Sequence, residues 1–288
     1  MLPIIENMRI KTKLLIGIIT PLIIAFLILI FITYNNNLES IIRYSEATSS
    51  KEASKVSEKF TKYSAISLTL LNSLKSRVFI NPAQRRSYFI DLAKEALIQN
   101  KDLFGTWFTF EANEFDGLDN LNINKPGSTI TGKFSPYWVR KDGNIVQIQS
   151  NDIDPNSSDY DFYNIPLKTQ RIHIPEPYKD PDAGIYMTSV CIPIVENNRS
   201  IGVLGVDLSL TEFSEIVNSI KPFKGSFALI IDNNGKIIIH NNPNYVGKLI
   251  SEIPNFLDAE SNGVLLSRYS QNKNFSEEVE TFDGNLLV

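Results

Sequence analysis

The strongest pattern in the chain is an uninterrupted run of apolar residues near its N-terminus. The segment from Leu14 to Ile32 carries no charged side chain and has about the length of a membrane span. Because the cytoplasmic flank of a membrane helix carries the excess of Lys and Arg, we expect residues 1–13 in the cytoplasm. We expect residues 14–33 to anchor the chain in the cell (inner) membrane and the rest of the chain to be extracytoplasmic. The basic residues that set this orientation stand just before the run, at Arg9, Lys11 and Lys13.

A cleavable signal peptide is the alternative interpretation of this segment. A signal peptide has a shorter apolar region, followed by a cleavage site of small residues. The run ends in FITYNNN, which offers no such site. The pattern therefore favours an anchor that stays attached.

Residues 34–78 have the pattern of a long helix with one apolar face. The segment contains no Gly or Pro, and its apolar residues recur at helical spacing, at Val56, Phe60, Tyr63, Ile66, Leu70 and Leu74. We expect the upper part of this helix to pack on a folded domain and its polar lower part to rise from the membrane. For Leu38 to Ser54, a disordered juxtamembrane linker is the alternative.

A second helix is predicted directly after the first. Asn81 followed by Pro82 is typical of a helix start, with Asn as the N-cap and Pro at the first helical position. The helix should end near Asn100. Its buried stripe is expected at Tyr88, Phe89, Leu92, Ala93, Ala96 and Leu97.

The pattern then changes to strands separated by turn residues. Residues 103–111 read as a first strand, and residues 134–140 and 144–150 as a hairpin around Lys141-Asp142-Gly143. The stretches between strands are expected to be loops, over residues 116–131, over the acidic segment 151–163, and over 166–176, which leads into the next hairpin.

The longest predicted hairpin joins residues 186–195 to residues 200–208 through the turn Glu196-Asn197-Asn198. Ser209 follows, with Glu212 three residues on, which is the spacing of a helix capping box. The helix that begins there presents an apolar face made of Leu210, Phe213, Ile216, Val217 and Ile220.

A second unit is predicted from about Gly225. It contains a hairpin around Asn233-Asn234-Gly235, and later elements at 251–270 and a turn at 282–285. Since hairpins dominate, we expect mainly antiparallel sheets with helices on their faces, which is the α+β class. We divide the extracytoplasmic part into a membrane-distal unit, 79–222, and a membrane-proximal unit, 223–288. The second unit is too short to close an ordinary sheet, so we expect the chain to be a piece of a longer protein.

Composition narrows the possible functions. The net charge of −4 and the pI near 5.4 argue against nucleic-acid binding. A single cysteine, Cys191, and two histidines allow neither an intrachain disulfide nor a Cys/His zinc cluster. The series Asp152-x-Asp154-x-Asn156 resembles a calcium loop but lacks its Gly and its final Glu. We therefore expect no cofactor, no metal and no catalytic constellation.

Acidic residues flank the longest hairpin. Asp180 precedes it, two residues after Tyr178, and Asp207 lies near its end. Because a buried charge must be paired, these carboxylates suggest a pocket for a cation. The alternatives are a solvated turn at Asp180, a capping role for Asp207, and aromatic residues that merely fill the core. The aromatic residues that could provide cation–π contacts are Tyr137, Trp138, Tyr160, Phe162, Tyr163 and Tyr178.

The order of these parts resembles a known family. The segments GKFSPYWVRKDGNIV, DYDFYNIPLKT, EPYKDPDAG, MTSVCIPIV and IGVLGVDLSL are similar to parts of the double-Cache extracytoplasmic sensing domain of bacterial methyl-accepting chemotaxis proteins. The resemblance spans about residues 14–250. It implies two PAS-like antiparallel sheets, a membrane-distal one that holds the ligand and a membrane-proximal one that is incomplete in this chain.

The resemblance also implies site residues. In amino-acid-sensing members, positions matching Tyr178, Asp180 and Asp207 hold the ligand's ammonium group. An Arg-x-Trp element that holds the carboxylate aligns with Tyr160 and Phe162, so the Arg is absent here. Asp159 and Asp161 add negative charge beside it, which favours a small amine, or a ligand with a cation at each end, over an ordinary α-amino acid. The predicted ligand set is Tyr178, Asp180, Asp207, Tyr160, Phe162, Asp161 and Trp138.

These features predict the sensing region of a transmembrane chemoreceptor, acting as a homodimer on a small-molecule amine or amino-acid-like cation. The same module could instead serve a histidine kinase or a diguanylate cyclase. An anchored binding or adhesion protein without signalling is an alternative of another class. A membrane-anchored hydrolase is disfavoured, because no catalytic arrangement is apparent.

Overall fold

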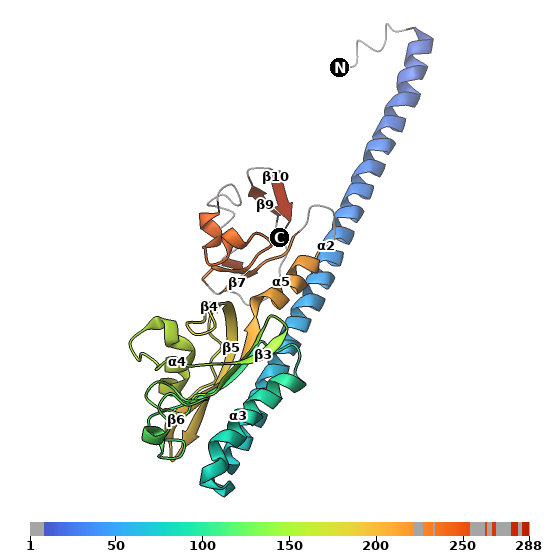
Figure 1. Cartoon of the computed structure of the whole chain (residues 1–288). Helices are drawn as coiled ribbons and strands as arrows, with labels where there is room; N and C mark the ends of the chain where they lie inside the picture. The colour runs from blue at the N-terminus through green and yellow to red at the C-terminus, as the bar shows by residue number, and fades with distance from the viewer. Residues whose placement is uncertain are drawn as a thin grey trace.

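One helix dominates the molecule. The computed structural model describes residues 9–221, 227–232, 234–253, 263, 267–268, 278–281 and 284–287. Helix α2 (Ile10–Lys75) has 66 residues and is therefore about 100 Å long. It runs without interruption from the apolar N-terminal segment to the folded domain, through Pro21 (Figure 1).

The surface of α2 changes along its length. Its N-terminal part is exposed, and it is long and apolar enough to cross a membrane by length and composition. Higher up, the predicted apolar stripe is confirmed, because Tyr63, Leu70 and Leu74 are buried against the domain. Residues 38–54 are helical, so the alternative of a disordered linker there is wrong.

Helix α3 (Pro82–Gln99) begins as its sequence predicts, after a short 3₁₀ turn, η1 (Ser76–Phe79). The side chain of Asn81 accepts a hydrogen bond from the backbone N–H of Ala83 at 3.0 Å, and Pro82 is the first helical residue. Phe89, Ala93 and Leu97 form the buried line of the helix. Tyr88, which was predicted to be buried, is 49% exposed because it lies to one side of that line.

The central element is a six-stranded antiparallel sheet in the order β3-β2-β1-β6-β5-β4. Both predicted hairpins are confirmed, and their turns place residues 142–143 and 197–198 at positive φ, as tight two-residue turns require. The two central strands pair from Gly105↔Asp207 to Phe110↔Gly202. The strands are β1 (Gly105–Phe110), β2 (Tyr137–Lys141), β3 (Asn144–Ile148), β4 (Tyr178–Lys179), β5 (Tyr186–Glu196) and β6 (Arg199–Ser209).

Each face of the sheet carries its own layer of helix. Helices α2 and α3 cover one face and enclose the main hydrophobic core, and α4 (Asp161–Thr169) lies at the other (Figure 1). Two short 3₁₀ turns, η2 (Asp119–Leu121) and η3 (Ser158–Tyr160), lie in the connecting loops. The sheet therefore separates a closed core from a second, smaller cluster of aromatic and polar residues.

Helix α4 was not predicted, since residues 151–163 and 166–176 were assigned to loops. It has nine residues with Pro166 inside, which removes a backbone donor and hides the helix from sequence signals. Burial stabilises it instead, because Phe162, Tyr163, Asn164 and Pro166 all pack inward.

Helix α5 (Leu210–Ser219) leaves the sheet and returns to α2. The hydroxyl of Ser209 accepts from the backbone N–H of Thr211 at 3.2 Å, and the side chain of Glu212, the other half of the predicted capping box, lies outside the described residues. The ring of Phe213 stacks on Phe60 of α2, with centroids 5.5 Å apart. This contact joins the end of the β5–β6 hairpin to the long helix.

The described residues after α5 form two small antiparallel pairs. They are formed by β7 (Ile230–Ile231) with β8 (Ile237–Ile239), and by β9 (Glu278–Thr281) with β10 (Gly284–Leu287). Two 3₁₀ turns, η4 (Pro243–Tyr245) and η5 (Ile250–Glu252), follow β8. Most of the elements predicted for 251–270, and the turn residues 282–283, lie outside the described residues. The architecture is α+β, as predicted.

Candidate ligand-binding site

The carboxylate of Asp207 lies inside the protein, in the central strand β6. The residue is 1% exposed. Its Oδ1 accepts hydrogen bonds from the indole Nε1 of Trp107 at 2.8 Å and from the hydroxyl of Ser189 at 2.7 Å. Its Oδ2 is buried and has no hydrogen-bond partner in the described part of the chain. Asp207 is therefore not the helix cap that sequence left open, since Ser209 takes that role.

Two glycines make the space for this arrangement. Gly105 stands opposite Asp207 in the register, and Gly205 stands opposite Trp107. A Cβ atom at Gly105 would lie 2.4 Å from Oδ2 of Asp207, and one at Gly205 would lie 2.3 Å from the indole ring. Each bulky polar group thus faces a residue without a side chain.

Asp180 approaches from the edge strand β4. Its Oδ1 accepts from the backbone N–H groups of Asp182 at 3.0 Å and Ala183 at 2.5 Å, and so caps the turn that ends at Gly184. The residue is nevertheless only 5% exposed. The solvated turn considered for this position is therefore wrong, because the carboxylate caps a turn while facing the protein interior.

Burial changes the protonation of both carboxyls. It raises the pKa of Asp207 to about 7, with a further contribution from the nearby charge of Asp180. It also raises the pKa of Asp180 to about 6. The hydroxyl of Tyr137 lies close to both groups and opposes these increases by favouring each ionised form. The two carboxyls thus form one electrostatically coupled pair.

Aromatic rings complete the surroundings. The ring of Phe162, carried by α4, stacks on Tyr178 with centroids 5.0 Å apart and meets Trp107 edge-on at 5.5 Å. The hydroxyl of Tyr178 hydrogen-bonds to that of Ser189 at 2.9 Å, and Ser189 donates to Asp207. Tyr178 is thereby connected to the buried carboxylate through one hydroxyl group.

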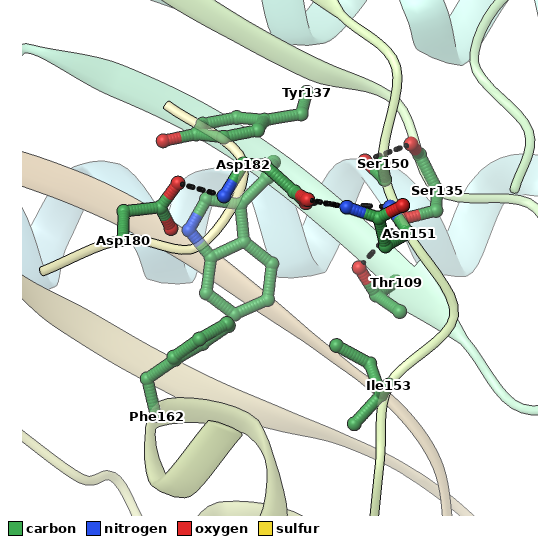
Figure 2. Close-up of a pocket in the computed structure, with 10 residues that line it drawn as sticks. Thr109, Ser135, Tyr137, Ser150, Asn151, Ile153, Phe162, Asp180 and Asp182 are labelled. Atoms are coloured by element: carbon green, nitrogen blue, oxygen red, sulfur yellow. Dashed lines mark hydrogen bonds between the residues drawn. The ribbon is translucent and has the colours of Figure 1, made fainter. Parts of the chain in front are cut away.

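A cavity of about 20 Å³, which is room for about one water molecule, borders Asp180, Tyr137, Phe162 and Trp107, the partner of Asp207. Figure 2 shows Asp180, Asp182 and Tyr137 at one end and Phe162 and Ile153 at the other. None of the described residues that line it is Lys or Arg. The lining consists of Trp107, Thr109, Ser135, Tyr137, Ser150, Asn151, Ile153, Phe162, Asp180 and Asp182.

The structure brings four of the predicted site residues together, namely Tyr178, Asp180, Asp207 and Phe162. Tyr160 is half-buried at the margin, with its ring 6.0 Å from that of Phe162.

Two predicted site residues lie elsewhere. Trp138 faces the opposite side of the sheet, where its Nε1 donates to the backbone oxygen of Ile90 at 3.0 Å and Lys94 lies over its ring. Adjacent strand residues point to opposite faces, so Tyr137 and Trp138 cannot both face the cavity. Asp161 is exposed on α4. The prediction that Trp138 and Asp161 line the pocket is wrong on this geometry.

Trp107 and Asp182 are site residues that the sequence reasoning missed. A signal for Trp107 exists in hindsight, because G-x-W at 105–107 and G-x-D at 205–207 complement each other across two antiparallel strands. It can be read only once the register is known. Asp182 lies in the same turn as Asp180, two residues further along the chain, so its proximity to Asp180 could have been inferred from the sequence.

The family comparison covers the same part of the chain. Residues 89–215 match the model described as "Methyl-accepting chemotaxis protein-like, first PDC sensor domain". Over these residues the chain is similar to a PDC sensor domain, of the Cache kind. The match begins in α3 and ends in α5, so it contains the sheet and the whole candidate site.

Individual relatives agree with this assignment. The chemotaxis protein TlpQ of Pseudomonas aeruginosa is 25% identical over 162 residues, which are 52% of this chain and 23% of TlpQ. The chain therefore spans less than a quarter of that relative. The extracellular domain of the histidine kinase mmHK1S-Z2 is 26% identical with a TM-score of 0.68, over 86% of this chain and 89% of that one. Methyl-accepting Chemotaxis protein X is 25% identical with a TM-score of 0.68, over 85% of this chain and 89% of that one.

These relatives are chemotaxis proteins and the extracellular domain of a histidine kinase. One solved structure comes from a histidine kinase and the other from a chemotaxis protein, so the same fold is found with both kinds of output. The comparisons therefore show similarity to sensor domains and leave the output open.

Proposed function

We propose that this chain is the extracytoplasmic sensing region of a transmembrane chemoreceptor and that Asp180 and Asp207 bind the ammonium group of a small amine. The observation that carries the proposal is the second carboxylate oxygen of Asp207, which is buried without a partner. Such an atom is costly unless a donor meets it, and an ammonium group supplies both the donor and the opposite charge.

The surroundings of the pair favour an amine over an α-amino acid. A ligand carboxylate is best held by a guanidinium, and the matching position is Tyr160. The described lining offers no cation, and Asp182 would repel a ligand carboxylate there. The rings of Trp107, Phe162 and Tyr178 can pack against the carbon chain and contribute cation–π attraction.

Signal transmission would use the helices on the other face of the sheet. A ligand shifts a receptor only through different affinities for its two states. β5 and β6 contact α2 directly, and the Phe60–Phe213 stack adds a second connection through α5. We expect the receptor to act as a homodimer, with α2 crossing the membrane.

The same sensor on a histidine kinase is the second candidate, and the likeness to mmHK1S-Z2 favours it specifically. A diguanylate cyclase output, or an anchored binding protein without signalling, would leave the sensing site unchanged.

Amine binding can be tested by the thermal unfolding of the full chain in detergent micelles. At 100 times its dissociation constant an amine such as heptylamine should add about 2.7 kcal/mol of stability. Asp207→Asn should abolish the increase in melting temperature without unfolding the domain. Asp159→Asn, which removes an exposed carboxylate near the site, is the matched control and should keep it. An increase with simple carboxylates and none with amines would contradict the proposal.

A further inference from the structure

A second cavity, of about 140 Å³, adjoins the first. Thr109 and Ile153 line both, so the two spaces are neighbours along strand β1. Helix α4 bounds the second cavity through Tyr163 and Asn164. The second cavity is the larger, and of its lining residues the sequence analysis named Tyr163, as an aromatic residue that could contact a cation.

Strand β1 connects the two cavities. Trp107, Thr109 and Glu111 alternate along the chain and so share one face of the sheet. Trp107 binds Asp207 in the first site, Thr109 borders both cavities, and Glu111 lines the second. Gly105, opposite Asp207, and Glu111 are six residues apart, which is roughly 20 Å between Cα atoms. The reach of the Glu111 side chain and a hydrogen bond of about 3 Å at each end reduce the distance between the two nitrogens of a bridging ligand to the order of 10 Å.

In the described part of the chain, Glu111 forms no ion pair. Its carboxylate accepts a hydrogen bond of 2.6 Å from the hydroxyl of Tyr163. Burial and the charge of Glu111 raise the pKa of Tyr163, so this hydroxyl stays protonated. Lys133 also lines the cavity. Its Nζ lies 3.8 Å from Oδ1 of Asp152, with which it forms an ion pair.

We propose that the second cavity is a subsite for a second cationic group of the same ligand, with Glu111 as its acceptor. The ligand class is then a linear diamine or polyamine with about 10 Å between its cationic ends. This inference rests on the proposed function, since Asp180 and Asp207 must hold the first ammonium group. Lys133 offers the opposite possibility, an acceptor of a ligand carboxylate, and the experiment separates the two.

Three ligands of equal length provide the test: α,ω-diaminoheptane, heptylamine and ω-aminoheptanoate. Titration calorimetry on the full chain in detergent micelles should show the diamine binding roughly 10-fold more tightly than heptylamine, as one added charge-assisted hydrogen bond implies. Glu111→Gln should reduce the ratio of diamine affinity to heptylamine affinity to about one. The variant should still bind heptylamine as the wild type does, which shows that it is folded. Glu114→Gln, whose carboxylate binds Arg199 outside both cavities, should keep the ratio.

Several outcomes would overturn the subsite. Equal weakening of both amines by Glu111→Gln would show a general structural role, and an unchanged ratio would show no contact. Tighter binding of ω-aminoheptanoate than of the diamine would assign the far end to Lys133. If heptylamine does not bind the wild-type chain, or binds the Asp207→Asn variant equally well, the proposed function itself fails and the subsite fails with it.

Discussion

Asp180 and Asp207 hold protons over the pH range in which free carboxyls are ionised. Their pKa values, about 6 and about 7, are raised mainly by burial. Other titratable groups near the pair, Asp182, Tyr137, Tyr178 and Cys191, also have pKa values raised by burial. Below about pH 7 a cationic ligand of the proposed site would therefore compete with a proton.

We expect amine binding to weaken as the pH falls. Above about pH 7 both carboxyls are ionised and affinity should level off, whereas below about pH 6 a proton competes with the ammonium group. The measurement is the dissociation constant of heptylamine between pH 5 and pH 8, together with proton release in buffers of different ionisation enthalpy. A pH-independent constant without proton release would contradict the coupling.

The unliganded protein should show the opposite trend in stability. Because both folded-state pKa values exceed the ordinary value of about 3.9, the stabilisation from these protonated carboxyls is complete below about pH 4. It is lost as the pH rises through about 6 and 7. The wild type should therefore lose melting temperature relative to Asp207→Asn between pH 4 and pH 8.

Gly205 should be intolerant of even one methyl group. In Gly205→Ala the new Cβ would overlap the indole of Trp107, which must move and give up its 2.8 Å bond to Asp207. We expect a loss of about 1–3 kcal/mol of stability from overpacking and weaker amine binding. Fluorescence in a Trp138→Phe background, where Trp107 is the remaining tryptophan, measures the ring movement. Ser200→Ala on the same strand should change neither property.

At the residue scale the sequence predicted chemistry better than placement. Asp207 and Asp180 were recognised because carboxylates beside apolar strands need partners. Trp138 was assigned to the wrong face of the sheet. Which of two adjacent residues points into the site depends on the register of the strand, and nothing in the local sequence distinguishes Tyr137 from Trp138 in this respect.

At the scale of elements, strong local signals were reliable. The Asn81-Pro82 start of α3 and the tight hairpin turns formed where they were predicted. Helix α4 was missed, because what holds it is burial of Phe162 and Tyr163 against the sheet, which no local pattern encodes. This matters for function, since α4 supplies residues to both cavities.

The packing of α2 on the sheet can be tested with two leucines of the same helix. Leu74 is fully buried in the main core, and Leu68 is 44% exposed. Leu74→Ala should lower the free energy of unfolding by about 2–5 kcal/mol, and Leu68→Ala by less than about 1 kcal/mol. Urea unfolding followed by tryptophan fluorescence measures both. Equal losses would show that α2 does not depend on this contact.

At the scale of the whole molecule, the α+β class and the order of parts were predictable, because hairpins and long helices leave clear periodic patterns. The continuity of α2 was not, since the sequence allowed a flexible linker over residues 38–54. The domain boundaries at 79–222 and 223–288 remain predictions, and part of the second unit lies outside the described residues.

Because α2 is unbroken, it fixes the direction in which the candidate pocket faces, measured around the helix axis, relative to the apolar N-terminal segment. Each residue added to an α-helix turns everything beyond it by about 100° and raises it by about 1.5 Å. One extra residue between Thr33 and Val56 would therefore point the pocket in a different direction, whereas seven would restore its direction to within about 20° at a greater height. The number of residues in this polar stretch, and not only their identity, is part of the geometry of the protein.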